Sequence, residues 1–147
     1  MQKILILDFG GPYSQLIARR VRECHVYCEV IPVRRLTMDL VRRFDPIGII
    51  LTGGTGSACD EAAPSLPREL FELGIPVLGI GYGCQLMAHM LGGDVQANTC
   101  PCGGSRTLTN LDPDDLLFAE QPVECITWML GGDRILAVPE GFSVTAH

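Results

Sequence analysis

Three glycines at alternate positions form the part of this sequence that most resembles a reactive site. Gly79, Gly81 and Gly83 stand between an apolar run at residues 75–80 and a helical pattern at residues 85–91. The frame G-x-nucleophile-x-G is typical of an elbow between a strand and a helix, where a strained turn exposes a Ser or Cys. Here Gly81 occupies the nucleophile position, so this elbow is expected to lack its reactive atom.

Cys84 is a weak candidate to replace that nucleophile. It follows Gly81 by three residues, in the first turn of the expected helix, where the helix N-terminus can lower the pKa of a thiol. However, it lies about one helical turn, ~5 Å, from the point of the elbow. A displacement of only ~1 Å can lower a rate ~100-fold. A small side chain that packs under the elbow is therefore the favoured interpretation.

The three histidines provide no convincing general base. His89 lies five residues after Cys84, so the two side chains do not share a helix face. His25 is expected in an exposed turn between a helix and a strand, and His147 is expected to be disordered at the terminus. No intact catalytic set is predicted.

The spacing of the glycines excludes two other glycine-rich motifs, the P-loop and the dinucleotide-binding fingerprint. A P-loop needs a Lys directly after its last glycine, but the only lysine of the chain is Lys3. A dinucleotide-binding fingerprint needs G-x-G-x-x-G after the first strand. Here the third glycine comes one place early and the motif follows the fourth expected strand. We therefore expect no cofactor of either type.

Cysteine spacing argues against a metal site. The seven cysteines are Cys24, Cys28, Cys59, Cys84, Cys100, Cys102 and Cys125. An odd number without a secretory signal indicates reduced thiols in the cytoplasm. Neither close pair has the C-x2-C spacing or the neighbouring histidines that are typical of zinc sites. We expect no bound metal.

Composition limits the partners. The 147 residues are 47% hydrophobic and carry a net charge of −6, which indicates a single globular domain over residues 1–147 without general attraction to nucleic acid or membranes. No apolar run is long enough to span a bilayer. Seven of the arginines lie in the first third of the chain. They form either a local patch for an anion or partner, or the solvated faces of two helices.

The hydrophobic pattern predicts a doubly wound, mostly parallel α/β fold. Expected strands at residues 3–8, 27–33, 48–52 and 75–80 alternate with expected helices at 13–23, 37–44, 66–73 and 85–91, as in flavodoxin-like proteins. Thr37 is a plausible N-cap. After residue 94 the expected strands at 105–108, 124–129 and 142–146 are separated by turns, one of them helical after Asp112. They predict an antiparallel C-terminal extension.

Glycine turns follow the first, third and fourth expected strands, at residues 10–11, 53–54 and 81–83. Parallel strands end at one edge of the sheet, where ligands of such folds bind. Glycines at that edge allow close approach of the backbone to a ligand. We expect a small-molecule site there, beside Gly53 and Gly54, and Tyr82 at the elbow lines either this pocket or a partner surface.

Nearly the whole chain resembles one family, the class I glutamine amidotransferase domain of GMP synthase. The resemblance covers residues 4–10 and 13–23, the strand and glycine turn at 48–54, and residues 74–80, which lead into the elbow. It continues through the helix residues 85–88, Leu91-Gly92-Gly93, Trp128-Met129, Gly132-Asp133 and residues 139–142.

The resemblance implies a glutaminase mechanism. In this family a cysteine at the elbow attacks the side-chain amide of glutamine, backbone amides stabilise the oxyanion, and a His supported by a Glu transfers protons. The ammonia passes to an ATP-pyrophosphatase domain, which converts XMP to GMP in purine biosynthesis. By this resemblance Gly53 and Gly54 mark the oxyanion turn, and Gln85 contacts glutamine.

The sequence departs from the family where the chemistry takes place. Gly81 replaces the cysteine, Leu130 and Gly131 replace a serine and a histidine, Thr55 replaces a proline, and residues 100–104 replace a segment with arginine and tyrosine. The chain ends at His147, before the expected catalytic His-x-Glu segment, so we interpret it as a C-terminally truncated domain.

Two functions remain open. By ancestry the chain is a GMP-synthase-type glutaminase domain. By its own residues it is a pseudoenzyme that binds glutamine, a related small molecule or a partner. A missing segment would also expose a sheet edge, which favours dimerisation.

Overall fold

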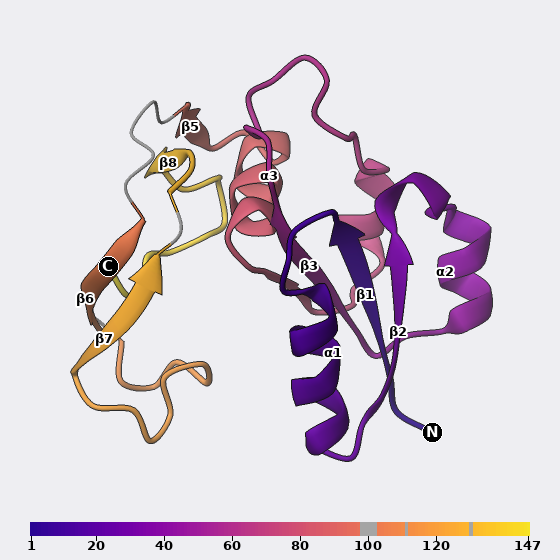
Figure 1. Cartoon of the computed structure of the whole chain (residues 1–147), viewed down its shortest axis with the longest axis horizontal. Helices are drawn as coiled ribbons and strands as arrows, with labels where there is room; N and C mark the ends of the chain where they lie inside the picture. Colours follow the sequence, from indigo (N-terminus) through magenta and orange to yellow (C-terminus); the bar gives the residue numbers. More distant parts are fainter. Residues whose placement is uncertain (98–102, 111, 130) are drawn as a thin grey trace.

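A parallel sheet of four strands forms the core of the computed structural model, which describes residues 1–97, 103–110, 112–129 and 131–147. Its strand order is β2-β1-β3-β4, the order of a flavodoxin-like sheet. The strands are β1 (Lys3–Phe9), β2 (Tyr27–Pro32), β3 (Gly48–Gly54) and β4 (Val77–Gly79). Figure 1 shows β1 and β3 at the centre. The prediction of a doubly wound parallel sheet is confirmed.

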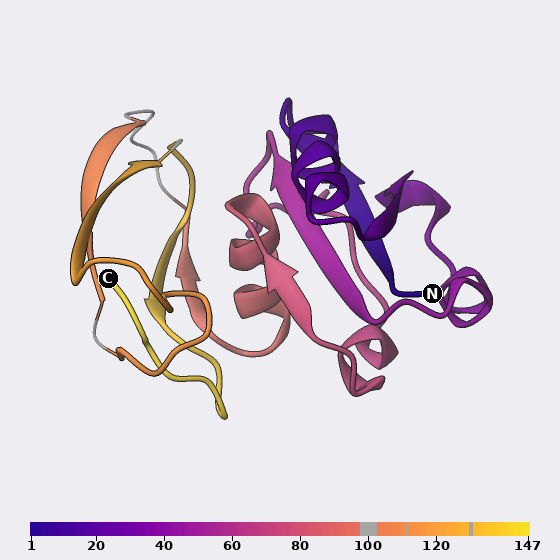
Figure 2. The same ribbon diagram turned by 90° about the horizontal axis from the view of Figure 1, so that it is seen from below.

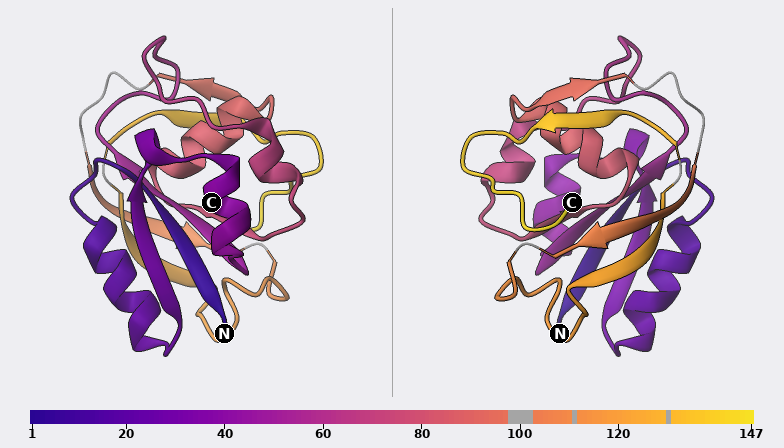
Figure 3. Two further views of the ribbon diagram at one scale, coloured as in Figure 1. Left: turned by 90° about the vertical axis from the view of Figure 1, so that its right-hand side faces the viewer. Right: turned by 90° about the vertical axis from the view of Figure 1, so that its left-hand side faces the viewer.

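Helical elements cover both faces of this sheet, as Figure 3 shows along its edge. Alternate residues of β1 point in opposite directions, so its unbroken apolar run serves two cores. Ile6 packs with Ala18 and Cys28 on the side of α1. Leu5 and Leu7 pack with Val41, Leu70 and Leu86 on the other side. The helical elements are α1 (Ser14–Glu23), η1 (Val33–Arg35), α2 (Met38–Phe44), η2 (Arg68–Glu72) and α3 (Tyr82–Met90).

The C-terminal part forms two small antiparallel sheets, β5 with β8 and β6 with β7. Their strands are β5 (Asp94–Gln96), β6 (Gly104–Thr109), β7 (Glu124–Met129) and β8 (Arg134–Ala137). Figure 2 shows this extension beside α3, at the end of the molecule opposite β2. The predicted antiparallel extension is therefore confirmed, including the strands expected at residues 105–108 and 124–129.

Several expected elements differ from those in the structure, and β4 covers only Val77–Gly79 of the strand expected at residues 75–80. The expected helix at 66–73 is the short 3-10 turn η2, because Pro67 precedes it and Gly74, with φ 70°, closes the segment. Residues 142–145 form no strand, and only Ala146 makes a bridge, to Asn110. Turns rather than a helix follow Asp112. Helix α3 begins at Tyr82 rather than at residue 85, because the elbow turns directly into it.

Other local expectations are settled by hydrogen bonds. The Thr37 hydroxyl accepts a bond from the Leu40 amide at 3.1 Å, so Thr37 is the N-cap of α2. The Asp8 carboxylate accepts one from the Gly10 amide at 2.8 Å, which stabilises the first glycine turn. Residues 98–102 and Leu130, and with them the Cys100/Cys102 pair, lie outside the described residues. Within the described part, no helix combines the length and apolar character needed to cross a membrane.

Candidate functional site

The backbone at Gly81 has the strained geometry of an elbow. Its φ is 56° and its ψ is −117°, a region that side-chain-bearing L-residues rarely adopt. Two hydrogen bonds fix the turn on either side. The backbone amide of Ile80 donates to the Leu51 carbonyl at 2.9 Å. The backbone amide of Gln85 donates to the Gly81 carbonyl at 3.1 Å, which starts α3. The chain therefore keeps the turn on which this kind of site presents a nucleophile.

The outer glycines are required by packing, whereas the point of the elbow is open. A Cβ on Gly79 would lie 2.6 Å from the Cys84 Cα, and one on Gly83 would lie 2.6 Å from the Leu51 Cβ. Neither contact is possible without movement of the backbone. A Cβ on Gly81 would meet nothing within 4 Å. The close packing of β3, β4 and α3 thus fixes the shape of the turn, and a side chain at position 81 is not needed for it.

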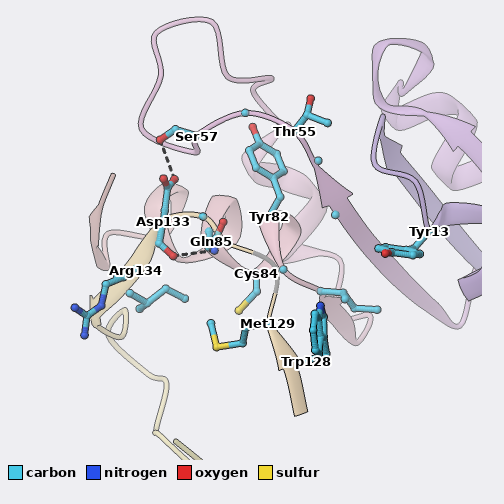
Figure 4. A pocket seen from close by; sticks show the side chains of 18 of the residues that line it. Tyr13, Thr55, Ser57, Tyr82, Cys84, Gln85, Trp128, Met129, Asp133 and Arg134 are labelled. Carbon is cyan, nitrogen blue, oxygen red and sulfur yellow. Dashed lines mark hydrogen bonds between the residues drawn. The ribbon is translucent and has the colours of Figure 1, made fainter. Parts of the chain in front are cut away.

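A cleft of about 890 Å³ opens over the carboxyl ends of β3 and β4. Gly81 lines it together with all the residues that the sequence proposed for binding and as a substitute nucleophile, namely Gly53, Gly54, Tyr82, Cys84 and Gln85. The far wall comes from the C-terminal extension, through Trp128, Met129 and residues 131–135. Figure 4 shows these two walls facing each other across the cleft. The site therefore lies between the parallel core and its antiparallel extension.

Burial makes Cys84 less reactive, contrary to the effect of the helix N-terminus considered from the sequence. Removal of the side chain from water raises the pKa of the Cys84 thiol above its ordinary value. The thiol is therefore protonated at neutral pH. Its sulfur points into the cleft on the side of Met129 (Figure 4). Burial is the cause of this shift, and Cys84 follows the point of the elbow by three residues.

None of the residues that line this cleft is a histidine. His25 and His89 are exposed, and His25 has a positive φ of 59°. The backbone of His147 pairs with that of Thr109 in the extension, so the expectation that His147 is disordered was wrong. In the described ranges no group of three or more His, Cys, Asp or Glu side chains is arranged to hold a metal ion.

Tyr82 is largely buried at the base of the cleft. Its ring lies 5.5 Å from that of Phe9, centroid to centroid, and packs closely on Gly54. Burial raises the pKa of the Tyr82 phenol, and the charges of Asp133 and Asp60 raise it further. The hydroxyl is therefore a neutral hydrogen-bonding group in a locally acidic environment.

Asp133 is the functional residue that sequence reasoning missed. It is buried, with 7% of its surface exposed. Its carboxylate accepts hydrogen bonds from the Ser57 hydroxyl at 2.9 Å and from the Ala58 amide at 2.6 Å. Its carbonyl accepts one from the Gln85 side-chain amide at 2.8 Å. The resemblance included Gly132-Asp133, but no local pattern indicated its partners.

A comparison with protein families identifies the group to which this architecture belongs. The model of glutamine amidotransferase class-I matches residues 5–147. The chain belongs to this family. The resemblance to class I glutamine amidotransferases that was stated from the sequence is therefore confirmed.

Relatives and solved structures agree with this assignment. The GMP synthase [glutamine-hydrolyzing] of Agathobacter rectalis is 47% identical over 146 residues, 99% of this chain and 28% of that protein. That of Clostridium perfringens is 48% identical over 98% of this chain and 28% of its own length. The amidotransferase chain thus spans little more than a quarter of these relatives.

Among solved structures, the fold is similar to that of a putative GMP synthase subunit from Thermoplasma acidophilum, with a TM-score of 0.84 and 26% identity over 99% of this chain and 72% of that one. A glutamine amidotransferase from Thermotoga maritima has a TM-score of 0.73 at 18% identity, covering 99% of this chain and 66% of that one. The fold is therefore that of class I glutamine amidotransferases.

Proposed function

We propose that this chain is a GMP-synthase-type amidotransferase domain that binds glutamine but does not hydrolyse it by itself. The observation that carries the proposal is the bare elbow. Gly81 keeps the backbone geometry of a nucleophile turn and offers no atom to attack the amide of a substrate. Acyl transfer by this route needs a nucleophile, a base and an oxyanion site together, and no described histidine or cysteine takes the first two roles.

Glutamine is the proposed ligand because the residues expected to bind it line one cleft. The cleft joins Gly53 and Gly54 at the end of β3 with Gln85 and the elbow. The side-chain nitrogen of Gln85 donates to the backbone carbonyl of Asp133. Among the described residues no group donates to the side-chain oxygen of Gln85, which can therefore accept a bond from a ligand N–H. Such an acceptor suits the amino or amide group of glutamine.

The wider role rests on the relatives. Two GMP synthases share close to half of their aligned residues with this chain. We therefore propose a cytoplasmic role in purine biosynthesis, beside an ATP-pyrophosphatase partner that aminates XMP. The relatives are named glutamine-hydrolyzing, and supplying ammonia is the family role from which this chain departs at Gly81.

A non-catalytic module that binds a partner is the second candidate. The specific observation in its favour is an apolar face on β7, where Ile126 is 80% exposed and Trp128 is 73% exposed. A second copy could also pair with β4, which lies at the edge of the main sheet. Size-exclusion chromatography with light scattering over a concentration series tests the homodimer.

Calorimetry and an ammonia assay test the main proposal. Titration with L-glutamine is expected to show binding that weakens up to about tenfold in Gln85→Ala, the loss of about one hydrogen bond. His89→Ala, on an exposed site of the same helix, serves as the control and is expected to bind normally. Ammonia release that depends on the protein would contradict the claim of inactivity, and absence of any binding would contradict the choice of ligand.

A further inference from the structure

A single buried carboxylate connects segments that are far apart in the sequence. Asp133 precedes β8, whereas Ser57 and Ala58 lie in the loop after β3, 76 and 75 residues away. Two donors converge on the same oxygen, Oδ2. Ala58 is only 1% exposed, so its amide has no access to water as a substitute partner. This loop is thereby held against the extension.

The same residue also holds the opposite wall of the cleft. Its carbonyl accepts the hydrogen bond from Gln85 Nε2, and this bond fixes which end of the Gln85 carboxamide faces the cleft. A Cβ on the neighbouring Gly132 would lie 3.1 Å from the same nitrogen, so the backbone approaches Gln85 closely. Figure 4 shows both sets of bonds meeting at Asp133.

We propose that Asp133 is a positioning residue that holds the loop after β3 and the side chain of Gln85 in the arrangement that binds glutamine. We refer to Asp133 with Ser57, Ala58 and Gln85 as the Asp133 clasp. This inference rests on the proposed function. The bonds from Ser57 and Ala58 go to the carboxylate, and hydrogen bonds to a buried charge are stronger than neutral ones. The bond from Gln85 goes to the backbone carbonyl of Asp133, whose position these two bonds hold.

One further hydrogen bond among the described residues joins the loop to the extension, from the Cys59 thiol to the Val95 carbonyl at 3.2 Å. Gly56, just after β3, adds flexibility to the start of the loop. Asp60 accepts a bond from the Ser57 amide at 3.2 Å, within the loop itself and at an exposed position. That contact shapes the turn but does not join the loop to the extension. Asp60 is therefore a matched control for Asp133.

The test compares Asp133→Asn, Ser57→Ala, their double variant and Asp60→Asn in the full chain. Glutamine affinity by calorimetry is expected to fall about tenfold in Asp133→Asn, less in Ser57→Ala, and no further in the double variant, because both changes break the same contact. Asp60→Asn is expected to bind like the wild type. Additive losses in the double variant, or an equal loss in Asp60→Asn, would overturn the proposal.

Two further measurements separate positioning from general damage. Hydrogen exchange is expected to quicken at the Ala58 amide and in residues 131–137 of Asp133→Asn, with β1 and β3 unchanged. Ultraviolet titration is expected to show a lower pKa for Tyr82, because the Asp133 charge that raises it is gone. If the wild type binds no glutamine, the proposed function fails and exchange alone decides on the clasp. Unchanged exchange at Ala58 would refute the clasp in either case.

Discussion

Substitution of Gly81 by cysteine tests whether the turn can still accommodate a nucleophile at its point. Gly81→Cys puts a side chain where a Cβ would meet nothing within 4 Å, at a φ of 56°. The cost is therefore backbone strain rather than overlap, about 1–3 kcal/mol. For a chain of this size each kcal/mol lowers the melting temperature by about 2–4 °C. Gly81→Ala is expected to cost the same, because it carries the same strain without sulfur.

Gly83→Ala provides the contrast. Its Cβ would lie 2.6 Å from the Leu51 Cβ, so α3 and β3 would have to separate. We expect a loss above about 3 kcal/mol, at the upper end of overpacking costs, or failure to fold. Urea denaturation measures all three variants on one scale. If Gly81→Ala is as destabilising as Gly83→Ala, the elbow is not open and our reasoning is refuted.

Reactivity gives a second, independent measurement on the same variant. A diazo-ketone analogue of glutamine is expected to form a covalent adduct with the introduced thiol of Gly81→Cys, detected by intact-mass spectrometry and located by peptide mapping. The wild type is expected to remain unmodified, since burial keeps the Cys84 thiol protonated. Ammonia release is not expected to return, because no described histidine lines the cleft to act as the general base. Labelling of Cys84 in both proteins would contradict this account.

Three other predictions follow from local contacts. Cys84 is expected to react with iodoacetamide more slowly at neutral pH than exposed Cys24, and its rate should keep rising above pH 9, beyond the ordinary thiol pKa of 9.0, as peptide mapping over a pH series will show. Folding raises the pKa values of both Cys84 and Tyr82, so the unfolded chain loses these two protons at lower pH than the folded chain does. The free energy of unfolding should therefore be constant at neutral pH and fall as the pH rises through the folded-state pKa values. Denaturation at pH 7 and at pH 10 measures this change. Thr37→Ala should cost about 1 kcal/mol through loss of the α2 cap, and an unchanged midpoint of thermal unfolding would contradict that role.

Features written into short stretches of sequence could be predicted. The unbroken apolar run of β1 indicates a strand buried on both faces, and the spacing of Gly79, Gly81 and Gly83 indicates an elbow whose outer positions tolerate no side chain. The element order then follows from the alternation of strand and helix. These inferences succeed because each depends on contacts within one element or between an element and its neighbour.

Features that depend on distant contacts could not be predicted. Strands β5 and β8 have only three and four residues, and they become strands by pairing across about 40 positions. The role of Asp133 depends on donors at Ser57 and Ala58 that no local spacing reveals. The raised pKa of Cys84 could not be predicted either, because the helix N-terminus is visible in the sequence whereas the extent of burial in the folded chain is not.

Packing fixes the outer glycines of the elbow during evolution, whereas the residue at its point is free to change. The contacts that set the shape of the turn belong to Gly79, Gly83 and Leu51, so the residue at position 81 is under no packing constraint. An active elbow carries a strained side chain, and a glycine there removes a cost of about 1–3 kcal/mol. A change from a nucleophile to glycine at this position is therefore expected to leave such a domain more stable, with a reserve that can absorb further substitutions elsewhere.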